Sequence, residues 1–186
     1  MPSPLLSTSP IALAFRHFRR NRGGSAAVEF AFVAPIFFAL IFAVFETALM
    51  FFAGQVLENA VQDSGRMVYV WTGKSPLPQS TFTTDFCPRV QLLFNCANVS
   101  IDMQSYPPGT PIPTVAPYDG SGNQTTPMSW NPGSPGSGNT VVLRVFYKWP
   151  LVVTGLGYNI ANINRGSINS QRLLTASAGF RIEPPP

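Results

Sequence analysis

The chain has 186 residues, of which 45% are hydrophobic and only 11% are charged, with 19 Pro and 15 Gly. This composition excludes a charged cytosolic enzyme and favours a membrane anchor joined to an uncharged, loop-rich exported part. The formal net charge of +4 does not indicate a nucleic-acid partner. Much of the basic excess lies in residues 1–24, and no cluster of Lys or Arg with interleaved aromatic residues follows that would bind phosphates.

A basic segment precedes a long apolar run. Residues 16–22 read Arg-His-Phe-Arg-Arg-Asn-Arg, and the chain from Ala26 to Ala53 is almost wholly apolar. A run of this length crosses a hydrocarbon core of roughly 30 Å. The positive-inside rule places residues 1–24 in the cytoplasm and the C-terminal part outside. We therefore predict a membrane protein with a single span, whose N-terminus is cytoplasmic and whose C-terminal domain is exported.

The apolar run fits an anchor better than an ordinary cleaved signal peptide. A signal peptide has an apolar region of about 7–15 residues followed by small residues at the cleavage site. Here the run is longer, and residues 51–54 read Phe-Phe-Ala-Gly. The sequence predicts three parts, namely a basic leader at 1–24, a transmembrane helix at 25–54 and a periplasmic α+β domain at 55–186.

Three residues interrupt the apolar character of the predicted span. A carboxylate near the start of a membrane helix costs about 2.5–3.5 kcal/mol on insertion scales, and less near the interface. Glu29 therefore indicates a function, unless its side chain reaches the headgroup region and is tolerated there. Glu46 either extends toward the outer interface or faces a partner helix. Pro35 removes a helix hydrogen bond, which predicts a kink or a melted turn, or it is a proline that the membrane tolerates.

The helix is expected to continue beyond the membrane, from Ser25 to Trp71, over about 70 Å. Its second half has one apolar stripe, on which a small domain can rest. The stripe repeats at three- and four-residue spacing and consists of Val56, Leu57, Ala60, Val61, Ser64, Met67, Val68 and Trp71.

The rest of the chain predicts a small antiparallel sheet packed on this helix, in an α+β fold. A short helix is expected around 82–94, and strands at 98–105, at 140–149 and near 172–181. The segment 106–138 is rich in Pro, Gly, Ser, Thr and Asn. It predicts a long exposed loop that is either functional or disordered.

Cys87 and Cys96 are the two cysteines, and both lie on the predicted exported side. In an oxidising periplasm, two cysteines that enclose a short loop favour a disulfide. A metal site would need further ligands, and the one His of the chain, His17, lies in the leader. A redox motif would have the closer Cys-x-x-Cys spacing.

The inventory of reactive groups argues against an enzyme. Ser-His or Cys-His chemistry is excluded on the exported side, because His17 lies on the other side of the membrane. The few exported acids are not spaced as a general acid/base pair. We expect no catalytic residues, no metal and no cofactor.

Several segments together resemble one family. Gly24-Ser25-Ala26-Ala27-Val28-Glu29-Phe30 resembles the prepilin-peptidase signature Gly-x-x-x-x-Glu-(Phe/Tyr) of Flp-type pilins and pseudopilins. The run 24–35 is similar to the opening of TadE-like proteins of the tight-adherence (Tad) system. The segments 87–106, 142–151 and 173–181 also look TadE-like, so the resemblance covers most of the chain except the long loop.

The resemblance implies a processing site formed by Gly24, Ser25, Glu29 and Phe30, with cleavage after Gly24 by a prepilin peptidase. It implies two possible roles for Glu29. The carboxylate helps the peptidase recognise its substrate, or it pairs with the free amine of a neighbouring subunit's Ser25. The resemblance also implies a pilin-like fold and a single-pass location in the bacterial inner membrane, with the N-terminus cytoplasmic and the C-terminal domain periplasmic. The implied partners are the inner membrane, the prepilin peptidase, pilin and pseudopilin subunits and the inner-membrane platform proteins of the Tad machinery.

The sequence therefore predicts a minor pseudopilin that takes part in assembly of a Flp/Tad-type pilus for adhesion. Its exported part is larger than that of the very short major Flp pilins. The alternative is an uncleaved, inner-membrane-anchored periplasmic binding or adhesin-like module, whose active surface is the loop 106–138.

Overall fold

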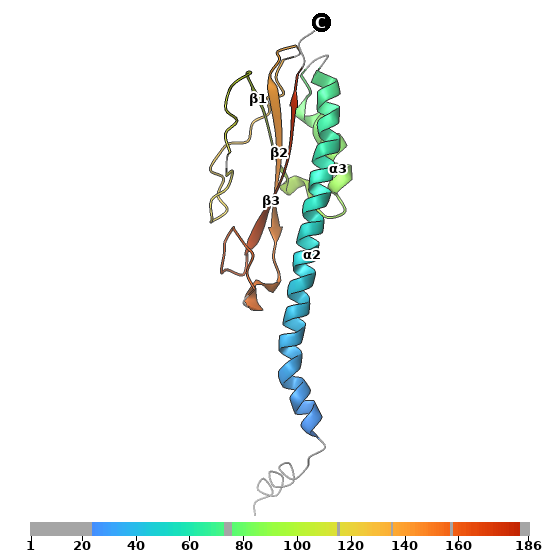
Figure 1. Ribbon diagram of the computed structural model, residues 1–186, viewed down its shortest axis with the longest axis vertical. Helices are drawn as coiled ribbons and strands as arrows, with labels where there is room; N and C mark the ends of the chain where they lie inside the picture. The colour runs from blue at the N-terminus through green and yellow to red at the C-terminus, as the bar shows by residue number, and fades with distance from the viewer. Residues whose placement is uncertain (1–23, 73–75, 115, 135, 157, 183–186) are drawn as a thin grey trace, which may run out of the picture. The chain divides into compact units, whose positions relative to one another are not determined.

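A computed structural model describes residues 24–72, 76–114, 116–134, 136–156 and 158–182. The leader 1–23 lies outside the described residues. The chain divides into two compact units between Phe42 and Ala43. The C-terminal unit contains all the strands, and Figure 1 shows its elements in order along the chain.

Helix α2 is continuous from Ser25 to Thr72 and has 48 residues, which confirms the long helix predicted from the sequence. It passes through Pro35 as α-helix, so the melted turn that the sequence left open does not form. Within the part of the chain that the structure describes, α2 is the one helix long and apolar enough to cross a membrane.

Three strands form one antiparallel sheet in the order β1-β2-β3. Strand β1 spans Ser100–Tyr106, β2 spans Thr140–Pro150 and β3 spans Gln171–Arg181. Helix α3, Gln79–Val90, lies between α2 and β1 in the chain, and two short 3₁₀ turns, η2 (Cys96–Asn98) and η3 (Val153–Leu156), follow α3 and β2. The predicted α+β architecture is confirmed.

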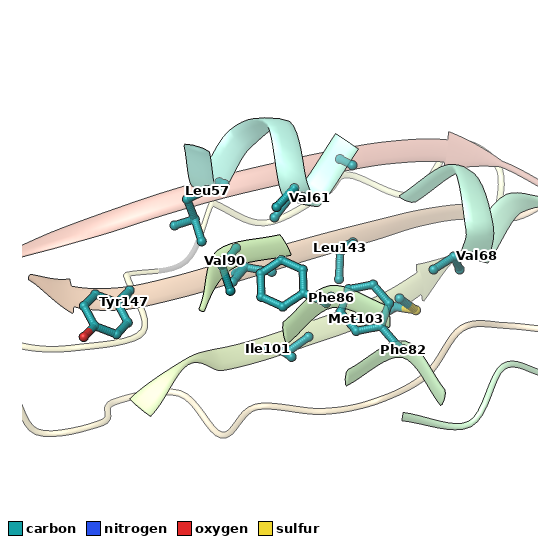
Figure 2. Close-up of a cluster of buried hydrophobic side chains, with 14 of the residues drawn as sticks. Leu57, Val61, Val68, Phe82, Phe86, Val90, Ile101, Met103, Leu143 and Tyr147 are labelled. Atoms are coloured by element: carbon teal, nitrogen blue, oxygen red, sulfur yellow. The ribbon is translucent and has the colours of Figure 1, made fainter. Parts of the chain in front are cut away.

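The core lies between one face of the sheet and the two helices. Strand β2 alternates buried and more exposed residues, with Val141, Leu143 and Val145 facing inward. The apolar stripe of α2 meets these residues through side chains such as Leu57 and Val61 (Figure 2). The helix approaches the sheet closely, since a Cβ on Gly65 would stand 3.2 Å from the Ala178 Cβ.

Helix α3 fills the core with aromatic rings. Phe82 and Phe86 are fully buried, and their stacked rings have centroids 5.6 Å apart. They lie beside Met103 of β1 (Figure 2). The Cys87–Cys96 disulfide, whose Cα atoms are 5.8 Å apart, ties α3 to η2 and confirms the predicted pairing.

The segment between β1 and β2 is not exposed throughout, which corrects the expectation of a long exposed loop. Residues 129–131 run parallel to β1 and bond to its edge, with Met103 N–H donating to Ser129 O at 2.8 Å and Asn131 N–H to Met103 O at 2.7 Å. The indole Nε1–H of Trp130 donates to Leu77 O at 2.7 Å, and its ring lies 5.3 Å from that of Phe82. A Trp in this polar segment therefore acts as an anchor to the core.

One glycine makes this approach possible. Gly133 has a φ of +79°, and a Cβ there would stand 2.6 Å from Ser105 Oγ. The left-handed conformation and the close contact both favour a residue without a side chain.

Replacing Phe86 by Ala should lower the free energy of unfolding by about 3–5 kcal/mol, because it leaves a cavity beside Phe82. Denaturant titration of the detergent-solubilised full chain measures this. Leu92→Ala is the matched control: Leu92 is 91% exposed, and its change should stay within about 0.5 kcal/mol. Equal losses for the two variants would contradict the core described here.

Candidate functional site

The predicted processing residues lie at the start of α2. Gly24 directly precedes the helix, and Ser25 is its first residue. Glu29 is exposed one turn later, and Phe30 beside it is also exposed. The residues implied by the resemblance thus lie together on one accessible helix start.

The first half of α2 is an exposed apolar surface. Its exposed large side chains point to all sides of the helix, since they follow one another with few gaps. They are Val28, Phe30, Phe32, Val33, Ile36, Phe37, Phe38, Leu40, Phe42, Val44 and Phe45. Because water solvates such a surface poorly, we expect lipid or other apolar helices to cover it.

Glu46 has a role that the sequence did not predict. It is only 8% exposed, and its carboxylate accepts the backbone N–H groups of Val152 and Val153. The Val153 N–H lies 3.1 Å from Oε1 and 3.2 Å from Oε2. The carboxylate of Glu46 is therefore satisfied by the chain itself, an arrangement that neither of the two expectations included. It holds the start of η3 against α2, where a carboxylate satisfies N–H groups that a helix start leaves unpaired.

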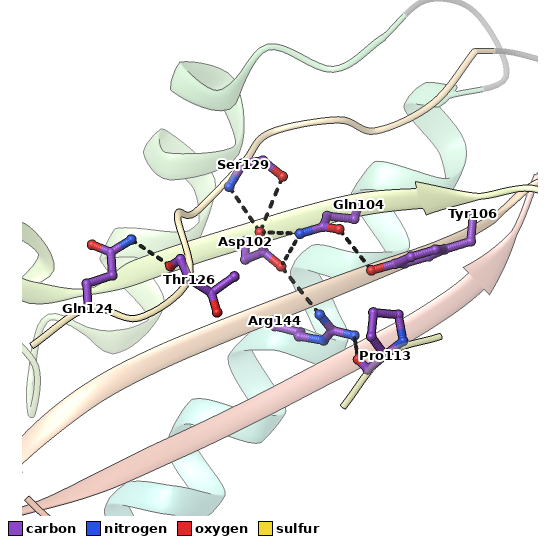
Figure 3. Close-up of polar contacts among 8 residues, drawn as sticks. All are labelled: Asp102, Gln104, Tyr106, Pro113, Gln124, Thr126, Ser129 and Arg144. Atoms are coloured by element: carbon purple, nitrogen blue, oxygen red, sulfur yellow. Dashed lines mark hydrogen bonds and ion pairs between the residues drawn. The ribbon is translucent and has the colours of Figure 1, made fainter. Parts of the chain in front are cut away.

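A second polar cluster lies on the face of the sheet opposite the helices (Figure 3). Asp102 of β1 is buried and accepts from the Ser129 N–H at 3.0 Å and from Gln104 Nε2 at 3.1 Å. Arg144 of β2 stands opposite it in register, with Nη1 3.6 Å from Asp102 Oδ2. Arg144 Nη2 also donates to Pro113 O at 2.8 Å.

This cluster fastens the β1–β2 segment to the sheet at two places, Pro113 and Ser129. Its polar groups satisfy one another, which is typical of a structural network rather than of a reactive site. A signal for it was present in the sequence: Asp102 and Arg144 both lie on the polar face of their predicted strands. The sequence does not give the register between β1 and β2, so it could not show that Asp102 and Arg144 lie opposite each other.

The arrangement offers little for catalysis or metal binding. No group of three or more His, Cys, Asp or Glu that could hold a metal ion occurs among the described residues. The carboxylate of Asp85 in α3 is paired with Arg89, whose Nε and Nη2 donate to its two oxygens at 3.1 and 3.0 Å.

Asp85 should make stability depend on pH. The hydrogen bond from Arg89 lowers the pKa of the Asp85 carboxyl below its ordinary value, with a smaller contribution from Ser64. A lowered folded-state pKa stabilises the fold at neutral pH, and this contribution is lost as the pH falls through the folded pKa. Asp85→Asn should therefore cost up to about 1 kcal/mol near neutral pH, because the pair is partly exposed. Unfolding midpoints of the two proteins across a series of acidic pH values test this. A cost of the substitution that does not shrink as the pH falls would contradict the prediction.

The Asp102 cluster gives a second prediction. Asp102→Ala removes the acceptor of the Ser129 amide and leaves Arg144 unpaired, so it should destabilise the protein by about 3 kcal/mol. Hydrogen exchange of the Ser129 amide should become faster, while the Thr125 amide, which donates to Pro117 O, should not change. Asp119→Ala is the control, since Asp119 bonds within its own turn, to Ser121 and Asn123. Unchanged protection of Ser129 in Asp102→Ala would contradict the fastening.

Comparison with known proteins gives one match. No curated protein and no solved structure matches the chain. Residues 24–66 match the model of a family described as "TadE-like protein". The matched segment begins at Gly24 and covers most of α2, including Glu29 and the start of the apolar stripe. The resemblance predicted from the sequence is thus confirmed over this segment, and the chain is TadE-like from residue 24 to residue 66.

Proposed function

We propose that this protein is a minor pseudopilin that takes part in assembly of a Flp/Tad-type pilus for adhesion. The observation that carries the proposal is α2 itself: within the TadE-like segment, a helix with the Gly24–Glu29 signature presents an apolar surface on all sides. The helix packs among the pilin and platform helices of the inner membrane. The folded unit on its distal half primes, caps or positions the fibre in the periplasm.

Processing is part of the proposal. The prepilin peptidase cleaves after Gly24, which frees the amine of Ser25 at the start of the apolar helix. The exposure of Gly24 and Glu29 supports access by the peptidase. The basic leader holds the bond at the cytoplasmic face, in keeping with the positive-inside rule.

Glu29 has the one exposed carboxylate in the apolar first half of α2, since Glu46 is satisfied within the chain. In lipid, an unpaired carboxylate is costly, and an ammonium group nearby offsets that cost. The Ser25 amine of a neighbouring subunit is such a group. Assembly through this pair involves no catalysis by the chain, no metal and no cofactor, and we propose that the protein is not an enzyme.

The processing prediction is tested by the intact mass and the N-terminal sequence of the membrane-extracted protein, in cells with and without their prepilin peptidase. We expect a chain that starts at Ser25 only when the peptidase is present. A chain that keeps residues 1–24 in both strains would contradict processing. It would favour an uncleaved anchored module whose active surface is the 106–138 segment.

Glu29→Gln should abolish piliation while the protein stays at its normal level in the membrane. Glu58→Gln is the matched control, since Glu58 lies on the same helix beyond the predicted span and bonds to Gln62 at 3.0 Å. If Glu29 serves recognition, uncleaved chains accumulate. If it pairs with the amine of Ser25, cleavage is normal and assembly alone is lost. Normal piliation in Glu29→Gln would contradict both roles.

A further inference from the structure

The connection between β2 and β3 is attached to one turn of α2. Glu46 accepts the N–H groups of Val152 and Val153. The next residue, Thr47, has its Oγ1 3.1 Å from the Tyr158 Oη. The two contacts hold Val152, Val153 and Tyr158 beside α2 at a defined level along the helix (Figure 1).

This level lies inside the predicted membrane helix 25–54, close to where the hydrocarbon core of a bilayer would end. About 20 apolar residues cross a hydrocarbon core of roughly 30 Å. Counted from Ser25, the core therefore ends close to Glu46 and Thr47. The apolar run continues to Ala53, and from Ala26 to Ala53 it measures about 42 Å, which matches the roughly 40–45 Å of a bilayer with its headgroups.

The connection exposes apolar side chains here. Val152 is 87% exposed although both of its neighbours, Leu151 and Val153, are buried. Tyr158, 40% exposed, joins an apolar ring to a hydroxyl, a combination favoured at membrane interfaces. Val152 therefore contributes nothing to the core beside it, and its exposed side chain is available for another apolar environment.

The charges around the connection suit anionic headgroups. The sequence has no acidic residue between Asp119 and Glu183, while Arg165 in the connection and Arg172 at the start of β3 are exposed. Arg172 also lies at a groove of about 390 Å³ beside α2. This groove is lined by Met50, Phe51, Gly54, Gln55, Glu58, Arg172, Leu173, Leu174 and Thr175. Arginine side chains near a membrane surface are attracted to anionic headgroups.

We propose that the β2–β3 connection is a membrane foot, defined as residues 151–156 and 158–170, that lies in the headgroup layer of the periplasmic leaflet. Val152 enters the boundary between headgroups and acyl chains, with Tyr158 beside it. Glu46 is the positioning residue, because it holds the foot against α2. The foot limits rotation and tilt of the folded unit relative to the bilayer. The inference rests on the proposed function only in that α2 spans the membrane.

The test uses the full chain, with its disulfide intact, in vesicles of phosphatidylethanolamine and phosphatidylglycerol. A fluorophore is attached to Val152→Cys, and lipids that carry a spin label either near the headgroup or deep in the acyl chain quench it. We expect severalfold stronger quenching by the shallow label than by the deep one. Phe38→Cys, in the middle of the predicted span, should be quenched most by the deep label.

Ile112→Cys is the matched control at an exposed apolar site remote from the foot. Its position along α2 follows from a series of contacts. The carbonyl of its neighbour Pro113 accepts a hydrogen bond from Arg144, and Arg144 lies opposite Ser177 in the sheet. The Ser177 carbonyl in turn accepts a hydrogen bond from Gln62 of α2. Gln62 lies 16 residues beyond Glu46, or about 24 Å along α2. The Ile112→Cys label should be quenched by neither lipid.

Glu46 gives the final arm of the test. Glu46→Ala should reduce shallow quenching at Val152→Cys severalfold, whereas Glu46→Gln, which keeps an acceptor oxygen, should retain most of it. If Phe38→Cys is quenched but Val152→Cys behaves like Ile112→Cys, the foot is overturned while the anchor stands, and the Val152 surface is free for a protein partner. If Phe38→Cys is not quenched either, the spanning helix and the foot both fail.

Discussion

The fold depends on the packing of a three-stranded sheet against one stripe of a long helix. Three strands alone bury too little apolar surface to be stable, and a helix of 48 residues has no tertiary support of its own. The distal half of α2 supplies Leu57, Val61 and Val68 to the core, and α3 closes it with Phe82 and Phe86. One helix thus serves as scaffold in its distal half and leaves its first half available to other molecules.

The same constraint explains how much of the structure could be predicted. Periodicity located α2 and the strands to within about two residues, because each apolar face is buried by a regular element. The disulfide between Cys87 and Cys96 was evident from their short spacing in the sequence. The position of Trp130 against Leu77 could not be predicted. In a segment rich in Pro and Gly, no local pattern indicates which aromatic side chain packs in the core.

Polar residues were the hardest to predict, for a physical reason. Glu46 was expected to interact with the membrane interface or a partner helix, since the chain from Ala26 to Ala53 is almost wholly apolar. Its partners, Val152 and Val153, are more than 100 residues away in the chain, and they contribute only backbone N–H groups, which every residue but proline has. Asp102 and Arg144 likewise meet only through the register of β1 and β2. Side-chain type predicts burial well, but it does not identify a distant partner.

The strip formed by residues 129–131 also limits how subunits can associate. A free strand edge is a template for sheet growth from one molecule to the next, and natural proteins block such edges to avoid aggregation. Here Ser129 and Asn131 occupy the hydrogen-bonding groups of Met103 in the middle of β1, and Trp130 fixes the strip to the core. In the proposed assembly, copies that meet in the membrane therefore cannot pair through the middle of this edge, and contacts between helices are left to order them.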